Sequence, residues 1–278
     1  MAGCVTPGDG EIPAIPAAGR TGGTRGARLL DAGGVLLSLV LLLLVWQGVS
    51  LLVSEKVMPS PFATARALAE ALPKPQIWSD IGVTLGRILS AFALAMAAGI
   101  AFGCALGAVH WFRRIFNLWV ILAASTPSIL YIVVIYLALG LTEAAAIVGG
   151  ALVVAPIITF NVWQGMRSLD PGLSEMARAF GVPRWVIFRR VLFPQTLPFL
   201  FAAARLGLTI TWKIMIFIEL LGRSSGVGYR IQQWYELFNM QQVLVSALPF
   251  LGVMLLIEVA VLRTLERRLF RWVREEAR

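Results

Sequence analysis

Three charged residues and a tryptophan stand in the apolar stretch at 198–220, where a charge is costly and therefore informative. Arg205, Trp212 and Glu219 are spaced seven residues apart, which is close to two helical turns, so a helix would carry them on nearly one face. Lys213 would lie roughly 80° around the helix from Arg205, at 100° per residue. Charged side chains inside an apolar helix usually mark a binding site, an ion path or a buried ion pair.

Two interpretations of this set are open from the sequence. In the first, the four residues line a path for a small solute, and the Lys213 ammonium attracts an anion in transit. In the second, the charges pair structurally with Arg87 or Glu143, which lie in or beside other apolar runs. The lining of a path is our working hypothesis.

The segment EMARAFGVPRWVIFRRVLFP, residues 175–194, is a second candidate, because it concentrates four arginines in a chain that is poor in charge. We expect a short helix from Leu173 to Phe180, with Ser174 as a possible N-cap. Gly181 would end this helix, because glycine readily takes the left-handed conformation that follows many helices.

The second half of this segment is predicted to start a new helix around Arg184, after Pro183 interrupts the first one. Pro194 and Pro198 are expected to break the chain again before the next apolar run. Glu175 would lie near the positive N-terminal end of the first helix. Such a pair of short helices could be a handle for a partner protein, or a helix at the lipid surface, which the arginines would also favour.

Other kinds of active site find no support in the sequence. Cys4 lies in the polar tail, Cys104 in an apolar run, and His110 is the single histidine, so we expect no structural disulfide and no zinc or iron site. The sequence has no G-x4-G-K-[ST] phosphate-binding loop, no Ser/His/Asp set and no paired buried carboxylates. We therefore predict no catalytic residue, no metal and no cofactor in this chain. The glycine-rich stretch GRSSGVGY at 222–229 is interpreted as a flexible turn.

Composition indicates which elements must position these residues. Of the 278 residues, 58% are hydrophobic and 14% are charged, with a mean hydropathy of +0.80, which is typical of a polytopic membrane protein. Lys and Arg in cytoplasmic loops account for the net charge of +9, so no nucleic-acid partner is expected. Six apolar runs are long enough to form transmembrane helices, at roughly 29–53, 80–109, 115–139, 143–165, 198–220 and 243–262.

The basic residues also predict an orientation. Most of them fall in alternate connecting segments, which the positive-inside rule assigns to the cytoplasm together with both termini and the loop at about 166–197. Residues 1–28 are expected to form a disordered tail, and residues 29–278 a single transmembrane domain. An amphipathic helix at about 263–276 would lie at the membrane surface, with a solvated tail as the alternative.

Two local patterns indicate packing. Gly99, Gly103 and Gly107 recur every fourth residue, which lets another helix approach closely, within the bundle or at a homodimer seam. Ser60 and Pro61 have the types preferred at the start of a helix, so we expect a short helix there that lies on the membrane.

A resemblance to a known family rests on these motifs. Permease subunits of bacterial ABC importers carry a cytoplasmic loop of the pattern E-A-A-x3-G-x9-I-x-L-P, which the segment 175–194 resembles. The matching residues of this chain are Glu175, Met176, Ala177, Gly181, Val191, Phe193 and Pro194. The stretches MPSP at 58–61, DIGVTLGRILSAF at 80–92, LDPGLSEMARAFG at 169–181 and IELLGRSSGVGYRI at 218–231 are similar to the nitrate, taurine and aliphatic-sulfonate branch. The stretch TPSILYIVVIYLALG departs from that branch, because it lacks a second proline and a WFG motif.

The resemblance implies an all-α permease of the type I importer kind in the bacterial inner membrane, used as a homodimer in contact with lipid. It further implies a separate ATPase subunit that binds ATP and receives the 175–194 loop, and a soluble solute-binding protein outside. Met176, Ala179 and Phe180 would offer that ATPase an apolar face, beside the charge of Glu175. The implied solute is a small anion of the nitrate, sulfonate or taurine type. The alternative is a stand-alone secondary transporter, which would need an intramembrane ion site.

Overall fold

The structure is a computed structural model that describes residues 25–54 and 57–262. Every element within this part of the chain is helical. The elements are α1 (Arg25–Leu52), α2 (Pro61–Ala71), α3 (Pro75–Ala108), α4 (His110–Ser125), α5 (Ser128–Leu139), α6 (Glu143–Arg167), α7 (Pro171–Ala179), α8 (Arg184–Ile187), η1 (Phe188–Leu192), α9 (Phe193–Gly222), α10 (Val227–Glu236), α11 (Met240–Leu256) and η2 (Ile257–Leu262). The predicted C-terminal helix at 263–276, and most of the predicted tail, lie outside the described residues.

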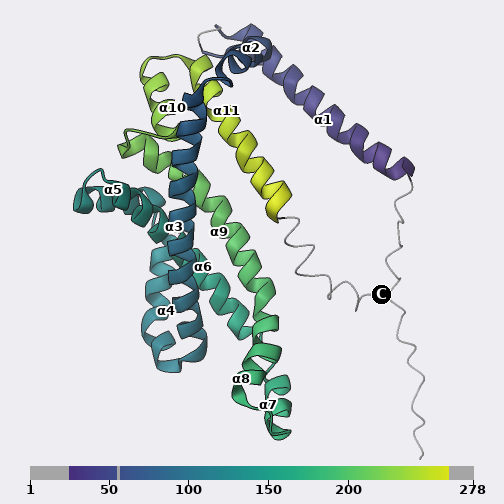
Figure 1. Ribbon diagram of the computed structural model, residues 1–278, viewed down its shortest axis with the longest axis vertical. Helices are drawn as coiled ribbons and strands as arrows, with labels where there is room; N and C mark the ends of the chain where they lie inside the picture. The colour runs from purple at the N-terminus through teal and green to yellow at the C-terminus, as the bar shows by residue number, and fades with distance from the viewer. Residues whose placement is uncertain (1–24, 55–56, 263–278) are drawn as a thin grey trace, which may run out of the picture. The chain divides into compact units, whose positions relative to one another are not determined.

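Internal contacts divide the chain after Val49 into two units, of which the second, from Ser50 onward, holds every element after α1. In this second unit, α7 and α8 lie at one end and α10 lies at the opposite end (Figure 1). We refer to these as the α7 end and the α10 end.

Within the described residues, four helical stretches are long and apolar enough to cross a membrane, and a bent pair of helices could make a fifth. The four are Pro75–Ala108, Glu143–Arg167, Arg184–Gly222 and Met240–Ala260, and the bent pair is α4 with α5. The all-helical fold is thereby confirmed for the described residues. The first predicted span is helical as α1, with an apolar part, Leu36–Leu52, that is shorter than the other spans. A total of six crossings, and the location of the termini, stay predictions.

The third predicted span is not one straight helix. α4 ends at Ser125 and α5 begins at Ser128, and the two axes meet at 97°. Thr126 is extended, with φ −72° and ψ 130°, because a residue before a proline is disfavoured in the helical conformation. Pro127 thus breaks the run that its hydrophobicity predicts to be continuous.

The expected break at Pro194 and Pro198 is wrong, whereas the predicted helix start at Arg184 is confirmed. Helix continues from Arg184 to Gly222, with Pro194 in the first turn of α9 and Pro198 inside it. The chain passes through the π-helical turn η1, in which the Phe193 N–H bonds the Phe188 carbonyl. The wider π turn replaces the regular hydrogen-bond ladder just before the prolines, which lack an N–H.

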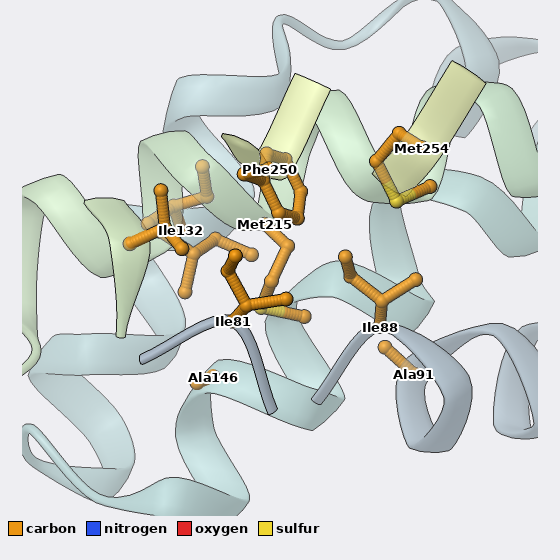
Figure 2. Close-up of a cluster of buried hydrophobic side chains, with 10 residues drawn as sticks. Ile81, Ile88, Ala91, Ile132, Ala146, Met215, Phe250 and Met254 are labelled. Atoms are coloured by element: carbon orange, nitrogen blue, oxygen red, sulfur yellow. The ribbon is translucent and has the colours of Figure 1, made fainter. Parts of the chain in front are cut away.

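The core of the second unit lies where α3, α6 and α9 pack against one another. One cluster of buried side chains draws on α3, α5, α6, α9, α10 and α11 (Figure 2). The three-glycine stripe of α3 faces α6, since side chains added at its positions would meet side chains of α6 at 2.5–2.7 Å; the pairs are Gly99 with Ile158, Gly103 with Val162 and Gly107 with Met166. Packing within the bundle is therefore confirmed as the role of the stripe.

The short helix near the start of the second unit is also as predicted. Ser60 is the N-cap of α2, and its hydroxyl accepts a hydrogen bond from the Ala63 N–H at 3.2 Å, with Pro61 in the first turn. Phe62 is exposed on this helix, which fits a helix that lies on a membrane surface.

The glycine packing can be tested on α3. Gly103→Ala would place a methyl group 2.7 Å from Val162 Cβ and 2.9 Å from the Thr159 carbonyl oxygen. We expect a loss of about 1–3 kcal/mol in stability, because a close-packed helix pair cannot absorb the added volume. The midpoint of thermal unfolding in detergent measures it. Gly82→Ala is the matched control, since a side chain there meets nothing within 4 Å, and equal midpoints for the two variants would contradict the packing account.

Candidate functional site

A carboxylate is buried among the apolar helices near the α10 end. Glu219 of α9 has 0% exposure. The Thr84 hydroxyl of α3 lies 2.9 Å from both carboxylate oxygens, the Gly228 N–H donates to Oε2 at 2.9 Å, and Arg87 Nη1 donates to Oε1 at 2.6 Å. A buried charge is tolerated only with such partners, because removal from water is otherwise very costly.

Arg87 is the centre of this network, and its side chain is 3% exposed. Its Nε and Nη2 donate to the two oxygens of Glu143 at 2.7 and 2.6 Å, in a bidentate pair. Nη1 also donates to the Ser225 carbonyl, and Nη2 to the Ser225 hydroxyl, at 2.7 and 2.8 Å. The planar guanidinium thus joins α3 to α6, to α9 and to the loop before α10. We call Thr84, Arg87, Glu143, Glu219 and Ser225 the clamp.

Glu143 also forms an ion pair with a second arginine, Arg223. Glu143 is the first residue of α6, which Thr142 caps by accepting a hydrogen bond from the Ala145 N–H at 3.1 Å. A carboxylate in the first turn is favoured by the helix dipole. Arg223 pairs with Glu143 and also donates to the Leu141 carbonyl. The two arginines and two carboxylates of this region balance in charge.

The prediction that 222–229 is a flexible turn is wrong. Gly226 has φ +100°, a conformation that favours glycine, and a side chain there would collide with the Glu219 carboxylate. The Val227 N–H donates to the Thr84 hydroxyl at 2.9 Å. The glycine-rich loop and the first turn of α10 therefore wrap closely around the buried carboxylate. The Gly228 N–H donates to it directly, and the Val227 N–H bonds the Thr84 hydroxyl that also contacts it.

The four residues predicted to line a path fall into different surroundings. Glu219 is in the clamp, so the structural pairing that the sequence left open describes its geometry here. Lys213 is exposed, and its Nζ lies 5.7 Å from the centre of the Trp212 ring, which in turn packs edge-on against Phe250. Arg205 is half-buried. A role in lining a path stays a prediction.

At the α7 end, the structure corrects the start of the predicted loop helix. α7 begins at Pro171, and its N-cap is Asp170, whose Oδ1 accepts from the Gly172 N–H at 2.8 Å. Ser174 is therefore inside the helix, where its hydroxyl donates to the Pro171 carbonyl at 2.9 Å. Glu175 lies beyond the first turn, so the helix dipole acts on it less than the sequence predicts.

The end of α7 is as predicted. Gly181 has φ +71°; its N–H donates to the Arg178 carbonyl at 2.9 Å, and the Val182 N–H donates to the Ala177 carbonyl at 3.1 Å. This pair of bonds is a Schellman motif, with glycine at the left-handed position. It closes the helix and reverses the chain toward α8.

An apolar stripe on α7 is left uncovered by the described residues. Leu173, Met176 and Phe180 follow one another at three and four residues, which places them on one face, and Met176 and Phe180 are 55% and 81% exposed. Glu175 and Ala179 are exposed beside them, and Ala177 is half-buried. Pro194 is half-buried at the start of α9.

The buried ion pair of the clamp predicts that one substitution destabilises the protein more than the two substitutions together. Arg87→Met alone should cost about 3–5 kcal/mol in stability, because it leaves the Glu219 charge buried without its cation. The double variant Arg87→Met/Glu219→Met should recover much of that loss, since well-packed apolar residues can replace a buried ion pair. Thermal unfolding in detergent measures both variants, with Arg66→Met on the exposed surface of α2 as a control. A double variant as unstable as the sum of the two single variants would refute the pairing.

Comparisons with known proteins bear on this arrangement. Residues 95–275 match the family model described as binding-protein-dependent transport system inner membrane component. A probable ABC transporter permease of Brucella melitensis is 30% identical over 78% of this chain and 87% of its own length. The taurine transport system permease of Escherichia coli is 26% identical over 84% of this chain and 88% of its own length.

Solved structures agree on the fold. A chain from an inward-facing methionine ABC transporter, MetNI, superposes with a TM-score of 0.58 at 24% identity, covering 72% of this chain and 98% of that chain. Further relatives are named as permeases for aliphatic sulfonates and for nitrate, so the resemblance to the nitrate, taurine and sulfonate branch is confirmed. The chain belongs to the inner-membrane permease components of binding-protein-dependent ABC transport systems and is a multi-pass protein of that membrane.

Proposed function

We propose that this chain forms the translocation pathway of an ATP-driven importer for a small anion, and that the segment 171–194 couples it to a separate ATPase subunit. The observation that carries the proposal is the exposed α7, capped at both ends, with its uncovered apolar stripe. In this proposal the α7 end faces the cytoplasm, and the α10 end faces outward. ATP binds to the partner subunit, so the chain itself needs no ATPase site and no cofactor.

The geometry of α7 suits a mechanical handle. Asp170 fixes its start and Gly181 its end, so the helix can transmit a push as one body. The exposed Met176 and Phe180 supply apolar area for a partner, and the exposed aromatic side chain is of a type enriched at interfaces. Glu175 adds a charge that a basic partner would favour.

The helix also has a direct route into the membrane spans. From α7 the chain enters α8 and then runs without a helical break through η1 into α9. A movement of α7 can therefore act on the long helix that carries Arg205, Trp212 and Lys213. η1 is the irregular point on that route, and π turns often occur at functional sites.

The proposed cargo is a small organic or inorganic anion of the sulfonate, taurine or nitrate type. The named relatives favour this class, and the exposed ammonium of Lys213 on α9 would attract it. Glu219 is held in the clamp in this conformation, so the attraction rests on Lys213. Two copies of the chain, in contact with membrane lipid, would enclose the pathway, and a soluble solute-binding protein would deliver the cargo at the α10 end.

The coupling role can be tested at the C-terminal end of α7. Gly181→Val should prevent the chain reversal, because a β-branched residue is strained at φ +71°. We expect loss of co-purification with the ATPase and at least a tenfold fall in import, with normal membrane insertion. Gly181→Asn is the matched control, since asparagine tolerates this conformation better.

Glu175→Lys reverses a charge on the exposed side of α7 and should give the same pattern in milder form. Import at the wild-type rate by a Gly181→Val/Glu175→Lys double variant that still retains its ATPase would show that the segment is only a membrane-surface helix.

The proposed orientation predicts opposite labelling of two exposed positions. Ser224 lies in the loop before α10, and Ala179 lies on α7. With Cys4 and Cys104 replaced, Ser224→Cys should react with an impermeant maleimide in intact cells, and Ala179→Cys only after permeabilisation. Reaction of both cysteines in intact cells would overturn the orientation and the coupling role together.

A further inference from the structure

A small pocket opens at the α10 end, between α2, α3, α10 and α11. Its volume is about 190 Å³, and its charged lining residues are Lys74, Asp80 and Arg230. This is smaller than the roughly 300–1,000 Å³ of a typical drug-sized site, so it suits a compact ligand. The two cations and one carboxylate leave an excess of one positive charge in the lining.

The guanidinium in this pocket is held in place. Arg230 Nε donates to Asp80 Oδ2 at 3.0 Å, and its Nη1 donates to Gln233 Oε1 at 3.0 Å. The side chains of Arg230 and Asp80 are 25% and 14% exposed, so the pair is partly shielded from water. Its Nη2 has no hydrogen-bond partner in the part of the chain that the structure describes.

Other donors in the lining are also unused. Neither the Lys74 ammonium, the Trp234 indole N–H nor the Gln242 side-chain amide has a partner among residues 25–54 and 57–262. The one carboxylate in the lining already accepts from Arg230. A ligand that offers several acceptor oxygens and a negative charge would therefore find more partners here than a cation or a neutral donor would.

The pocket lies next to the clamp. Asp80, Thr84 and Arg87 follow at four and three residues along α3, so they share one face. Val227 lines the pocket, and its N–H donates to the Thr84 hydroxyl of the clamp. Val227 thus contacts both the pocket and the clamp, and Asp80 of the pocket shares a face of α3 with two clamp residues.

We propose that this pocket binds one small oxyanion group, of the sulfonate or phosphate kind, between Lys74 and the guanidinium of Arg230. The proposal rests on the proposed function in one respect, the outward orientation of the α10 end, where an imported anion would arrive first. Two sources at that face carry the same chemistry: a free anionic solute and the phosphate of an anionic lipid headgroup.

Binding can be measured without transport. The chain, purified with its ATPase, is placed in nanodiscs of neutral phosphatidylcholine and titrated with radiolabelled methanesulfonate by equilibrium dialysis. We expect saturable binding that an excess of the neutral isostere dimethyl sulfone does not displace. Lys74→Gln should raise the Kd at least fivefold, and Gln242→Leu at least twofold. Arg66→Gln, which removes an exposed cation of α2 outside the pocket, should leave the Kd within twofold.

The source follows from repeating the titration in nanodiscs that contain phosphatidylglycerol. Retained methanesulfonate binding indicates a free solute, and its loss indicates that the lipid phosphate fills the pocket; both results support the oxyanion site. Absence of saturable binding in phosphatidylcholine, or a Kd that Lys74→Gln leaves unchanged, overturns it. ATP-driven methanesulfonate uptake by the importer in proteoliposomes is measured separately. Uptake without saturable binding in the pocket would overturn the oxyanion site and still support the proposed function.

Discussion

The need to satisfy one buried carboxylate shapes the α10 end of this protein. Glu219 would be very costly to bury alone, and Arg87 would be equally costly without its carboxylates. Neighbouring segments supply the donors and acceptors: Thr84 from α3, Glu143 from α6, Ser225 from the loop after α9, and Gly228 from the first turn of α10. Removal of Arg87 would leave Glu219 without its cation, and removal of Glu219 would leave Arg87 with Glu143 alone, so the spans and the loop depend on one another.

The α7 end is built on different principles. No comparable ion-pair network joins the described elements there. A short capped helix projects from the bundle, and a π turn followed by two prolines leads into α9. Tight glycine packing holds α3 against α6 between the two ends. This contrast favours a molecule whose α10 end is fixed while changes of shape enter through the α7 end.

Much of this arrangement is predictable from local rules. Gly181 at φ > 0, the helix start at Arg184, the Ser60 cap and the packing of Gly103 each follow from the conformational preferences of one or two residues. The errors arise where tertiary context decides. Pro127 breaks a run that reads as continuous, whereas Pro198 lies inside α9 without ending it.

The clamp itself is only half visible in the sequence. Pairing of the charges at 198–220 with Arg87 or Glu143 is one of two open interpretations, because the sequence shows charges in apolar runs without showing which helices touch. The role of Gly226 and Val227 is missed for a further reason. Glycines that wrap a carboxylate look the same in sequence as glycines of a flexible turn, and the Thr84 hydroxyl that joins them lies 143 residues away. The offset between Ser174 and the true cap Asp170 is a smaller error, since serine and aspartate are both good caps.

We expect the clamp to keep the α10 ends of α3 and α9 together throughout transport. Spin labels at Leu89 and Leu221, both exposed and each two residues beyond a clamp residue, would report the distance between these helices in the complete importer by double electron–electron resonance. The account predicts the same distance distribution without nucleotide and with a trapped ATP state, and a broadened distribution in the Arg87→Met/Glu219→Met variant. A wild-type distance that shifts between the two nucleotide states would contradict it.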